Sequence, residues 1–243
     1  MFRNTKGVGA MSDQESIRPL KLWQSFLFFL GPGLYGFLAT TFLFPLLTGL
    51  GVSEENAYHT VHYSVFILLF VMIFAALRSE GRTLNRRTLR ERMRYKRMDS
   101  IAWKWTIPFL LLYLILGFGL NTLALLVYER LGFWPSDADI PLTSIPLLLI
   151  GFVANIFSEE LLWRGIILPR QELEHGKWAW LVNGVLWTLF HLSKWYAMPF
   201  MLLKQWMLPF VAQRTQNNTP AFLIHFVSNG LSIIMTIIAL LSS

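Results

Sequence analysis

Long apolar segments are the feature that most constrains the fold of this chain. Several are about as long as the ~20 residues that an α-helix needs to cross a bilayer, and polar segments separate them. In lipid, only helices and closed barrels satisfy every backbone hydrogen bond, and the sequence lacks strand-like alternation of apolar and polar residues. We therefore expect an all-α, multi-spanning transmembrane helical bundle of about seven spans.

The composition agrees with a membrane protein. Hydrophobic residues make up 54% of the 243 residues and charged residues only 14%, which is too apolar for a typical soluble domain. The chain has no Cys, which excludes disulfides, thiolate metal sites and a cysteine nucleophile. Any chemistry must therefore come from other polar side chains.

The expected spans divide the chain into three parts. Residues 1–20 are predicted to be a polar tail, residues 21–140 the N-terminal membrane spans, and residues 141–243 a membrane core. The expected spans are 22–50, 53–77, 105–128, 141–169, 178–195, 198–212 and 220–241.

Local signals mark several ends of these spans. Pro32 lies between two glycines and is expected to kink the first helix or end a short interfacial piece. Ser53 and Thr219 are the expected N-caps of the second and last helices. Residues 129–140 are expected to form a polar loop.

Positive charge is concentrated in one segment, which we call the basic loop. Residues 78–104 hold ten Lys and Arg against Glu80, Glu91 and Asp99, so this loop carries +7, the net charge of the whole chain. The positive-inside rule places the loop and the N-terminus in the cytoplasm of a multi-pass protein, which we assign to the plasma membrane. We expect the loop to contact anionic lipid, and no nucleic acid, because no nucleic-acid-binding motif accompanies it.

Three of the predicted spans, 141–169, 178–195 and 220–241, carry ionisable residues that could form one site. Such groups are costly at membrane depth, about 2.5–3.5 kcal/mol each on insertion scales, so they indicate a functional site. In chain order these residues and one amide neighbour are Glu159, Glu160, Arg164, His191, His225 and Asn229.

Helical spacing gives the two glutamates different expected roles. Glu160 and Arg164 are four residues apart and can pair on one helix face. Glu159 is rotated by about 100° and is not committed to that pair. A carboxylate at low dielectric binds protons more readily, which suits a general base at Glu159.

The histidines extend the predicted site. His225 and Asn229 are one helical turn apart and offer an imidazole and an amide N–H, as an oxyanion hole needs. His191 has no carboxylate nearby in sequence, and Glu159 is its expected partner across the bundle. Taken singly, these groups could be solvated charges, an interfacial histidine or an interhelical hydrogen-bond pair. Their joint occurrence favours one site.

His59 and His62 lie near the start of the second span and are each flanked by a tyrosine. Histidines in such a setting are typical of the interfacial aromatic belt, and we favour that interpretation over a metal clip.

Three motifs in the second half of the chain together resemble the signature of the CPBP family, which comprises type II CAAX prenyl endopeptidases and bacteriocin-processing and immunity proteins. The motifs are Glu159-Glu160-x-x-x-Arg164-Gly165, Trp187-x-x-x-His191 and His225-x-x-x-Asn229. The resemblance covers about residues 141–241. It departs from the family at Trp187, where the family usually has Phe.

The resemblance implies an intramembrane endopeptidase that hydrolyses peptide bonds of membrane-associated proteins or peptides. Glu159 and His191 would activate a water molecule, and His225 and Asn229 would stabilise the oxyanion. The alternatives are a non-catalytic membrane partner, such as an immunity or regulatory protein, and less strongly a transporter.

The resemblance also bears on support and metal. Glu160 and Arg164 would support the site. The family is often labelled metalloprotease-like, and Glu159, His191 and His225 have the composition of a His₂Glu zinc site. We favour no metal, with Zn²⁺ as the alternative.

From the predicted topology, we expect the cavity to open on the cytoplasmic side, at the end where the basic loop lies.

Overall fold

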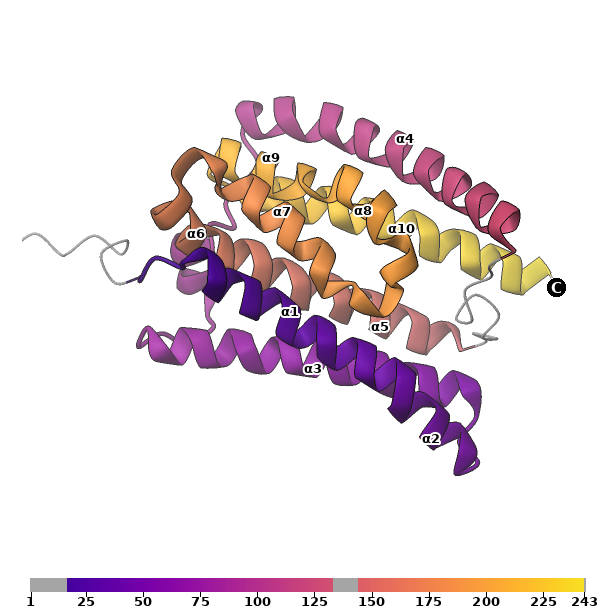
Figure 1. Ribbon diagram of the computed structural model, residues 1–243. Helices are drawn as coiled ribbons and strands as arrows, with labels where there is room; N and C mark the ends of the chain where they lie inside the picture. Colours follow the sequence, from indigo (N-terminus) through magenta and orange to yellow (C-terminus); the bar gives the residue numbers. More distant parts are fainter. Residues whose placement is uncertain (1–16, 133–143, 243) are drawn as a thin grey trace, which may run out of the picture.

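The computed structural model describes residues 17–132 and 144–242, and the regular secondary structure of these residues is entirely helical (Figure 1). The predicted all-α membrane bundle is confirmed. Most of the predicted polar tail (residues 1–16) and residues 133–140 of the predicted polar loop lie outside the described residues. The helices are α1 Leu22–Leu38, η1 Ala39–Leu43, α2 Phe44–Gly49, α3 Glu54–Ser79, η2 Thr88–Arg92, α4 Ser100–Leu131, α5 Ile145–Glu159, η3 Glu160–Ile167, α6 Leu168–His175, η4 Gly176–Trp178, α7 Ala179–Phe190, η5 Leu192–Ala197, α8 Met198–Gln205, α9 Met207–Thr215 and α10 Thr219–Ser242.

Five segments of the described chain are long and apolar enough to cross a membrane: Leu22–Gly49, Glu54–Ser79, Ser100–Leu131, Ile145–Phe190 and Thr219–Ser242. The fourth reverses at Gly176, whose φ of +52° suits a glycine, so that α7 runs back along α6 and η3. The predicted sixth span is present as α8 and α9. The count is therefore roughly consistent with the seven spans expected.

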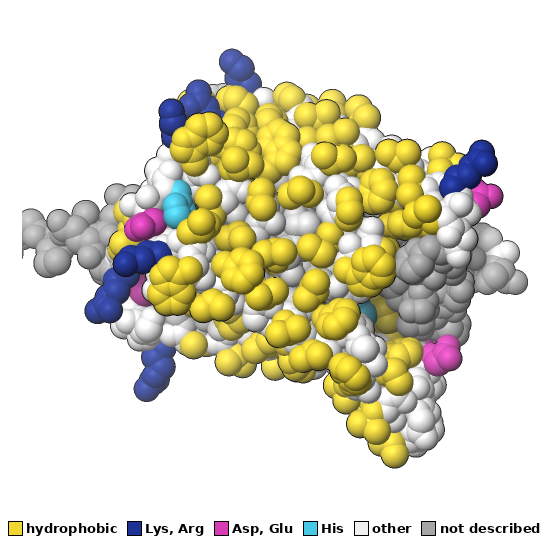
Figure 2. Space-filling model, viewed as in Figure 1, with side chains coloured by type: hydrophobic (Ala, Val, Ile, Leu, Met, Phe, Trp, Pro, Cys, Tyr) yellow, Lys and Arg dark blue, Asp and Glu magenta, His cyan; other side chains and the backbone are white. Residues whose placement is uncertain are grey.

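The outer surface has the character of a lipid-facing surface. Ile67, Ile115 and Phe118 are each more than 60% exposed although they lie in the middle of long helices. Figure 2 shows hydrophobic side chains covering the centre of one face, while most Lys and Arg side chains on that face gather at the end where α6 lies in Figure 1. The protein is a multi-pass membrane protein.

Of the two expectations for Pro32, the end of a short interfacial piece is wrong. Pro32 is buried inside α1, which continues to Leu38 and passes through the π-helical η1 into α2, so the helix does not end there. The neighbouring Gly33 is required by packing, because a Cβ atom at this position would lie in impossible contact with the carbonyl oxygen of Leu189. The glycine lets α1 approach the end of α7 closely.

The predicted helix caps are half correct. The hydroxyl of Ser53 accepts a hydrogen bond from the backbone N–H three residues later, as expected of an N-cap. The N-cap of α10 is Asn218, whose carbonyl oxygen accepts from Phe222, and not Thr219. Thr219 is the first helical residue, and its hydroxyl donates to the carbonyl oxygen of Lys96 instead (2.7 Å).

The basic loop packs beneath the end of the bundle formed by α3 and α6. Arg92 is buried and makes a two-armed contact with Glu80 (2.8 and 2.7 Å), which Arg170 also contacts (2.6 Å). Arg92 further donates to the carbonyl oxygen of Gly165 (3.0 Å) in η3. Burial disfavours the charged form of Glu80, but the hydrogen bonds and charges of the two arginines outweigh it and lower the pKa of this carboxyl.

Further contacts close the same end of the bundle, which we call the closed end. Arg94 pairs with Glu172 (2.7 Å). The buried side chain of Asn218 donates to the carbonyl oxygens of Met93 (2.6 Å) and Arg164 (2.9 Å). Part of the basic loop is therefore a structural plug that fills this end of the bundle.

Candidate active site

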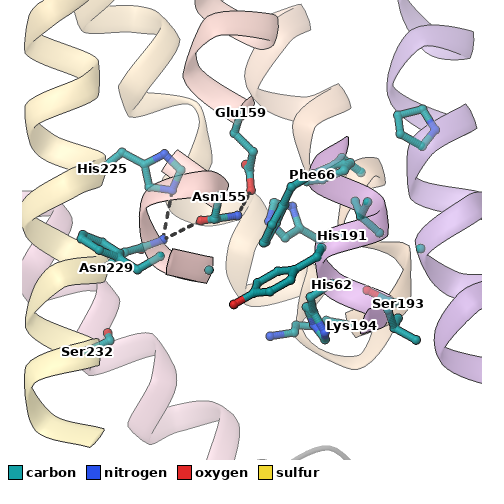
Figure 3. Close-up of a pocket in the computed structure, with 18 of the residues that line it drawn as sticks. His62, Phe66, Asn155, Glu159, His191, Ser193, Lys194, His225, Asn229 and Ser232 are labelled. Atoms are coloured by element: carbon teal, nitrogen blue, oxygen red, sulfur yellow. Dashed lines mark hydrogen bonds between the residues drawn. The ribbon is translucent and has the colours of Figure 1, made fainter. Parts of the chain in front are cut away.

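A cavity of ≈ 460 Å³ lies within the bundle, and the four predicted catalytic side chains line it (Figure 3). Its walls come from α1, η1, α3, α4, α5, α7, η5, α8 and α10. The four residues are Glu159, His191, His225 and Asn229. Segments far apart in the sequence thus meet at one place, as the joint interpretation of the motifs predicted.

The two glutamates are separated by a change in helix type. Glu159 is the last residue of α5, and Glu160 is the first residue of the π-helical η3. Both are buried, at 2% and 0% exposure, but only Glu159 lines the cavity. The predicted difference between the two side chains is confirmed in geometry.

Glu159 is held by two donors. The amide of Asn155 donates to Oε1 (2.5 Å), and the indole N–H of Trp187 donates to Oε2 (2.8 Å). Figure 3 shows Asn155 between Glu159 and Asn229. Each carboxylate oxygen has one protein donor and keeps a further lone pair that can accept from a bound water.

His191 does not form the expected hydrogen bond with Glu159 in the described structure. Its Nδ1 lies 3.0 Å from the carbonyl oxygen of Trp187 and 3.3 Å from Nε2 of Gln205. The Nδ1 side of the imidazole is engaged by the backbone of Trp187 and the amide of Gln205 instead, so these contacts and not the carboxylate orient the ring. Glu159 and His191 still line the same cavity.

His225 bridges the second glutamate and the asparagine. Its Nδ1 lies 2.8 Å from Oε1 of Glu160, and its Nε2 lies 3.2 Å from Nδ2 of Asn229. Nδ2 of Asn229 also lies 3.4 Å from Oδ1 of Asn155. With Glu159 ionised, this chain of bonds places the proton of neutral His225 on Nδ1, and Asn229 donates to both neighbours.

Arg164 connects the two halves of the network. It pairs with Oε1 of Glu160 (3.3 Å), as predicted, and both side chains are fully buried. Its guanidinium also lies over the ring of Trp187, 3.7 Å from the centroid. The contacts close into one circuit, which we call the polar ring. Its members are Glu159, Asn155, Asn229, His225, Glu160, Arg164 and Trp187.

Sequence reasoning missed several of these residues. Asn155 lies one helical turn before Glu159, and its polar side chain in an apolar run was the available signal. The indole donor of Trp187 gave no such signal, because tryptophan is common in membrane spans. His59 and His62 also line the cavity, and the assignment of these histidines to the interfacial belt did not predict this position.

The cavity extends away from the basic loop. From Glu159 it runs along the first turns of α3 and α5 and the later turns of α10, reaching Tyr58, Leu147 and Ser232. The basic segments lie at the other ends of these helices. The expectation that the cavity opens on the basic side is therefore wrong. The physical reason is the plug formed by the basic loop, which fills that end of the bundle.

The predicted alternative metal site does not fit the arrangement of its ligands. Both ring nitrogens of His225 are engaged, one by Glu160 and the other by Asn229. In residues 17–132 and 144–242, no group of three His, Asp or Glu side chains is arranged to hold a metal ion. A metalloprotease-like site is therefore not supported.

The fold and the cavity define a polytopic membrane protein with a hydrolase-type set of polar groups buried at membrane depth. Residues 141–231 match the family model described as type II CAAX prenyl endopeptidase Rce1-like. This match confirms the resemblance to the CPBP family over that part of the chain. No curated protein and no solved structure shows a significant match to the chain.

Proposed function

We propose that the protein is an intramembrane endopeptidase that hydrolyses a peptide bond of a membrane-associated protein or peptide. One observation carries this proposal: Glu159 and His191 line the same buried cavity as the His225–Asn229 pair. A base and an anion-stabilising group on either side of one space are the two elements that peptide hydrolysis needs.

In the proposed reaction, Glu159 takes a proton from a water molecule held against His191. The oxygen of that water attacks the scissile carbonyl carbon, and the carbonyl oxygen becomes an oxyanion. An N–H of Asn229 turns from Asn155 to this oxygen, while neutral His225, which donates to Glu160, accepts the other N–H of Asn229 and holds the amide in place. The C–N bond then breaks, and Glu159 returns its proton to the leaving amine nitrogen.

Glu160 and Arg164 have a supporting role in this proposal. Glu160 contacts His225, and Arg164 lies over the ring of Trp187, which donates to Glu159. The buried Glu160–Arg164 pair therefore fixes both the base and the His225–Asn229 pair. The proposed reaction uses no metal, because the engaged nitrogens of His225 leave no three-ligand site.

The test compares cells that express the wild-type protein with cells that express Glu159→Gln. New N- and C-termini in the membrane proteome should appear only with the wild-type protein, because removing a general base lowers turnover by about 10²–10⁴-fold. Glu174→Gln, an exposed carboxyl outside the cavity, is the matched control and should behave as wild type.

Two results would contradict the proposal. A Glu159→Gln strain that keeps its termini and its phenotype would point to a non-catalytic membrane partner. Stoichiometric zinc in the purified protein, with activity lost to a chelator and restored by zinc, would replace the metal-free mechanism.

We also propose an orientation and a lipid partner. The closed end with the basic loop faces the cytoplasm of the plasma membrane, where its exposed arginines, such as Arg86 and Arg90, contact anionic lipid. The cavity then opens toward the outer face. Nucleic acid is not a proposed partner.

Single-cysteine labelling tests this orientation without background, because the natural chain has no Cys. Arg86 and Glu54 are exposed and lie at opposite ends of α3 and the loop that follows it. In intact cells, Glu54→Cys should react with an impermeant maleimide and Arg86→Cys should react only after lysis. The reverse pattern would place the cavity mouth on the cytoplasmic side.

A further inference from the structure

The residue at which this chain departs from its family occupies a central place in the polar ring. Trp187 is 1% exposed, and its indole makes two polar contacts on different sides. The edge donates its N–H to Oε2 of Glu159 (2.8 Å), and the face carries the guanidinium of Arg164 (3.7 Å from the centroid). A phenylalanine could keep the second contact but not the first.

We infer that the indole N–H of Trp187 is a positioning group for Glu159, and that Arg164 acts on Glu159 through this indole. The inference rests on the proposed function, because it assigns Trp187 to the same base. A buried N–H donor stabilises an ionised carboxylate and fixes its rotamer. A cation over the ring face draws electron density from the ring and makes its N–H a better donor.

The geometry explains how the base stays available without a histidine partner. Asn155 and Trp187 hold the carboxylate from two sides, one donor on each oxygen. Glu159 is thereby fixed toward the cavity, and its remaining lone pairs face a bound water. In this arrangement His191 is free of the carboxylate and can hold the water, since its Nδ1 is bonded to the backbone of Trp187. Trp187 therefore positions both groups that activate the water in the proposed reaction, Glu159 through its indole and His191 through its backbone carbonyl.

A second buried tryptophan provides a matched control. Trp163 is 0% exposed, lies in η3 and stacks on Phe29 with ring centroids 4.2 Å apart. Its indole N–H has no hydrogen-bond partner among the described residues, and it does not line the cavity. Trp187→Phe and Trp163→Phe make the same chemical change at the same burial, and only the first removes a donor from Glu159.

A spectroscopic measurement tests the contact without any substrate. The protein is labelled with ¹⁵N-indole tryptophan in detergent micelles, and the Trp187 and Trp163 signals are assigned by their loss in the two Phe variants. Glu159→Gln should move the Trp187 indole signal upfield in both proton and nitrogen dimensions, because a charged acceptor is replaced by a neutral one. It should leave the Trp163 signal in place. An unmoved Trp187 signal would overturn the inference.

A kinetic measurement tests the positioning role. The probe is an internally quenched peptide that carries the cleavage sequence found by comparing termini. Loss of one donor makes protonation of Glu159 easier, so Trp187→Phe should move the acidic limb of the kcat/KM profile to higher pH by about one unit. Trp163→Phe should leave the limb unchanged. Other imidazole and ammonium groups line the cavity and are the same in both variants: His59, His62, His191, Lys194, Lys204 and His225.

The outcomes separate this inference from the proposed function. If Trp187→Phe and wild type share one pH profile, Trp187 is only a packing residue and the inference fails while the proposed function stands. If Glu159→Gln moves the indole signal but cleaves the probe as fast as wild type, the contact exists, and the proposed function fails together with the positioning role. Trp187→Phe is expected to fold, because Phe is the residue that the family usually has here.

Discussion

The closed basic end and the open cavity contain similar charged residues in different surroundings. At the closed end, Glu80 is contacted by both Arg92 and Arg170, and the exposed fraction of its side chain is 3%. In the cavity, Glu159 is contacted only by neutral donors, Asn155 and Trp187. One carboxylate is paired with arginines, and the other has no ion-pair partner among the described residues.

This difference indicates what each end does. Paired charges with complementary geometry hold segments together and exchange protons only at acidic pH. A carboxylate held by neutral donors keeps its capacity to accept a proton from water. The basic end is therefore suited to closing the bundle and the cavity to proton transfer. The following variants test that distinction, from the largest expected effect to the smallest.

Arg164→Ala should have the largest effect on stability. It leaves Glu160 charged and fully buried without its arginine, and breaking a buried pair costs about 3–5 kcal/mol. The thermal unfolding midpoint in detergent should fall sharply. Arg87→Ala removes an exposed pair of the same spacing, with Glu91, and should cost about 1 kcal/mol or less. Equal midpoints for the two variants would show that Arg164 does not stabilise the ring.

Asn229→Ala should lower kcat more than it raises KM, because the proposed contact forms in the transition state. Loss of one oxyanion donor lowers the rate by about 10²–10³-fold. Thr236→Ala, two turns further along α10 and directed at the backbone of Ser232, should leave the rate unchanged. An effect confined to KM would make Asn229 a substrate-binding residue.

Arg92→Ala should destabilise the closed end by about 1.5–3 kcal/mol through its lost charged hydrogen bonds, with the acidic limb of the activity profile unchanged. The exposed Arg90→Ala is the control and should unfold at the wild-type midpoint. A shifted acidic limb in Arg92→Ala would mean that the two ends are electrostatically coupled.

The closed end also has a predictable pH dependence. The pKa of Glu80 is lowered in the folded protein, so its pairing contributes stability above the ordinary carboxyl pKa of 4.5. That contribution is lost as the pH falls through the lowered value. Glu80→Gln should therefore be less stable than wild type at neutral pH, and the gap should narrow in acid. A constant gap would contradict the role of ionised Glu80.

Much of the fold could be predicted because transmembrane helices are encoded locally. The start of α3 at Ser53 and the length of α10 follow from caps and from continuous apolar runs. The Glu160–Arg164 and His225–Asn229 contacts follow from residues four apart on one helix. These inferences need no knowledge of neighbouring helices.

The unpredicted features all depend on contacts between segments. The close approach of Gly33 in α1 to the end of α7 cannot be inferred from the sequence of either segment. The plug at the basic end depends on Arg92 reaching the carbonyl of Gly165 in η3. Hydropathy treats Arg92 as one more charge in a loop and cannot identify its partner.

The sequence by itself determined the class of protein, the order of its spans and four of the residues that line the cavity, Glu159, His191, His225 and Asn229. Hydrophobic length and the 3.6-residue period set these features within single helices. Only the tertiary structure decided that Glu159 bonds to Trp187 and not to His191, and that the cavity opens away from the basic loop. The rotation and depth of each helix are set by packing against its neighbours, so the partners of a side chain across the bundle are a property of the assembled fold.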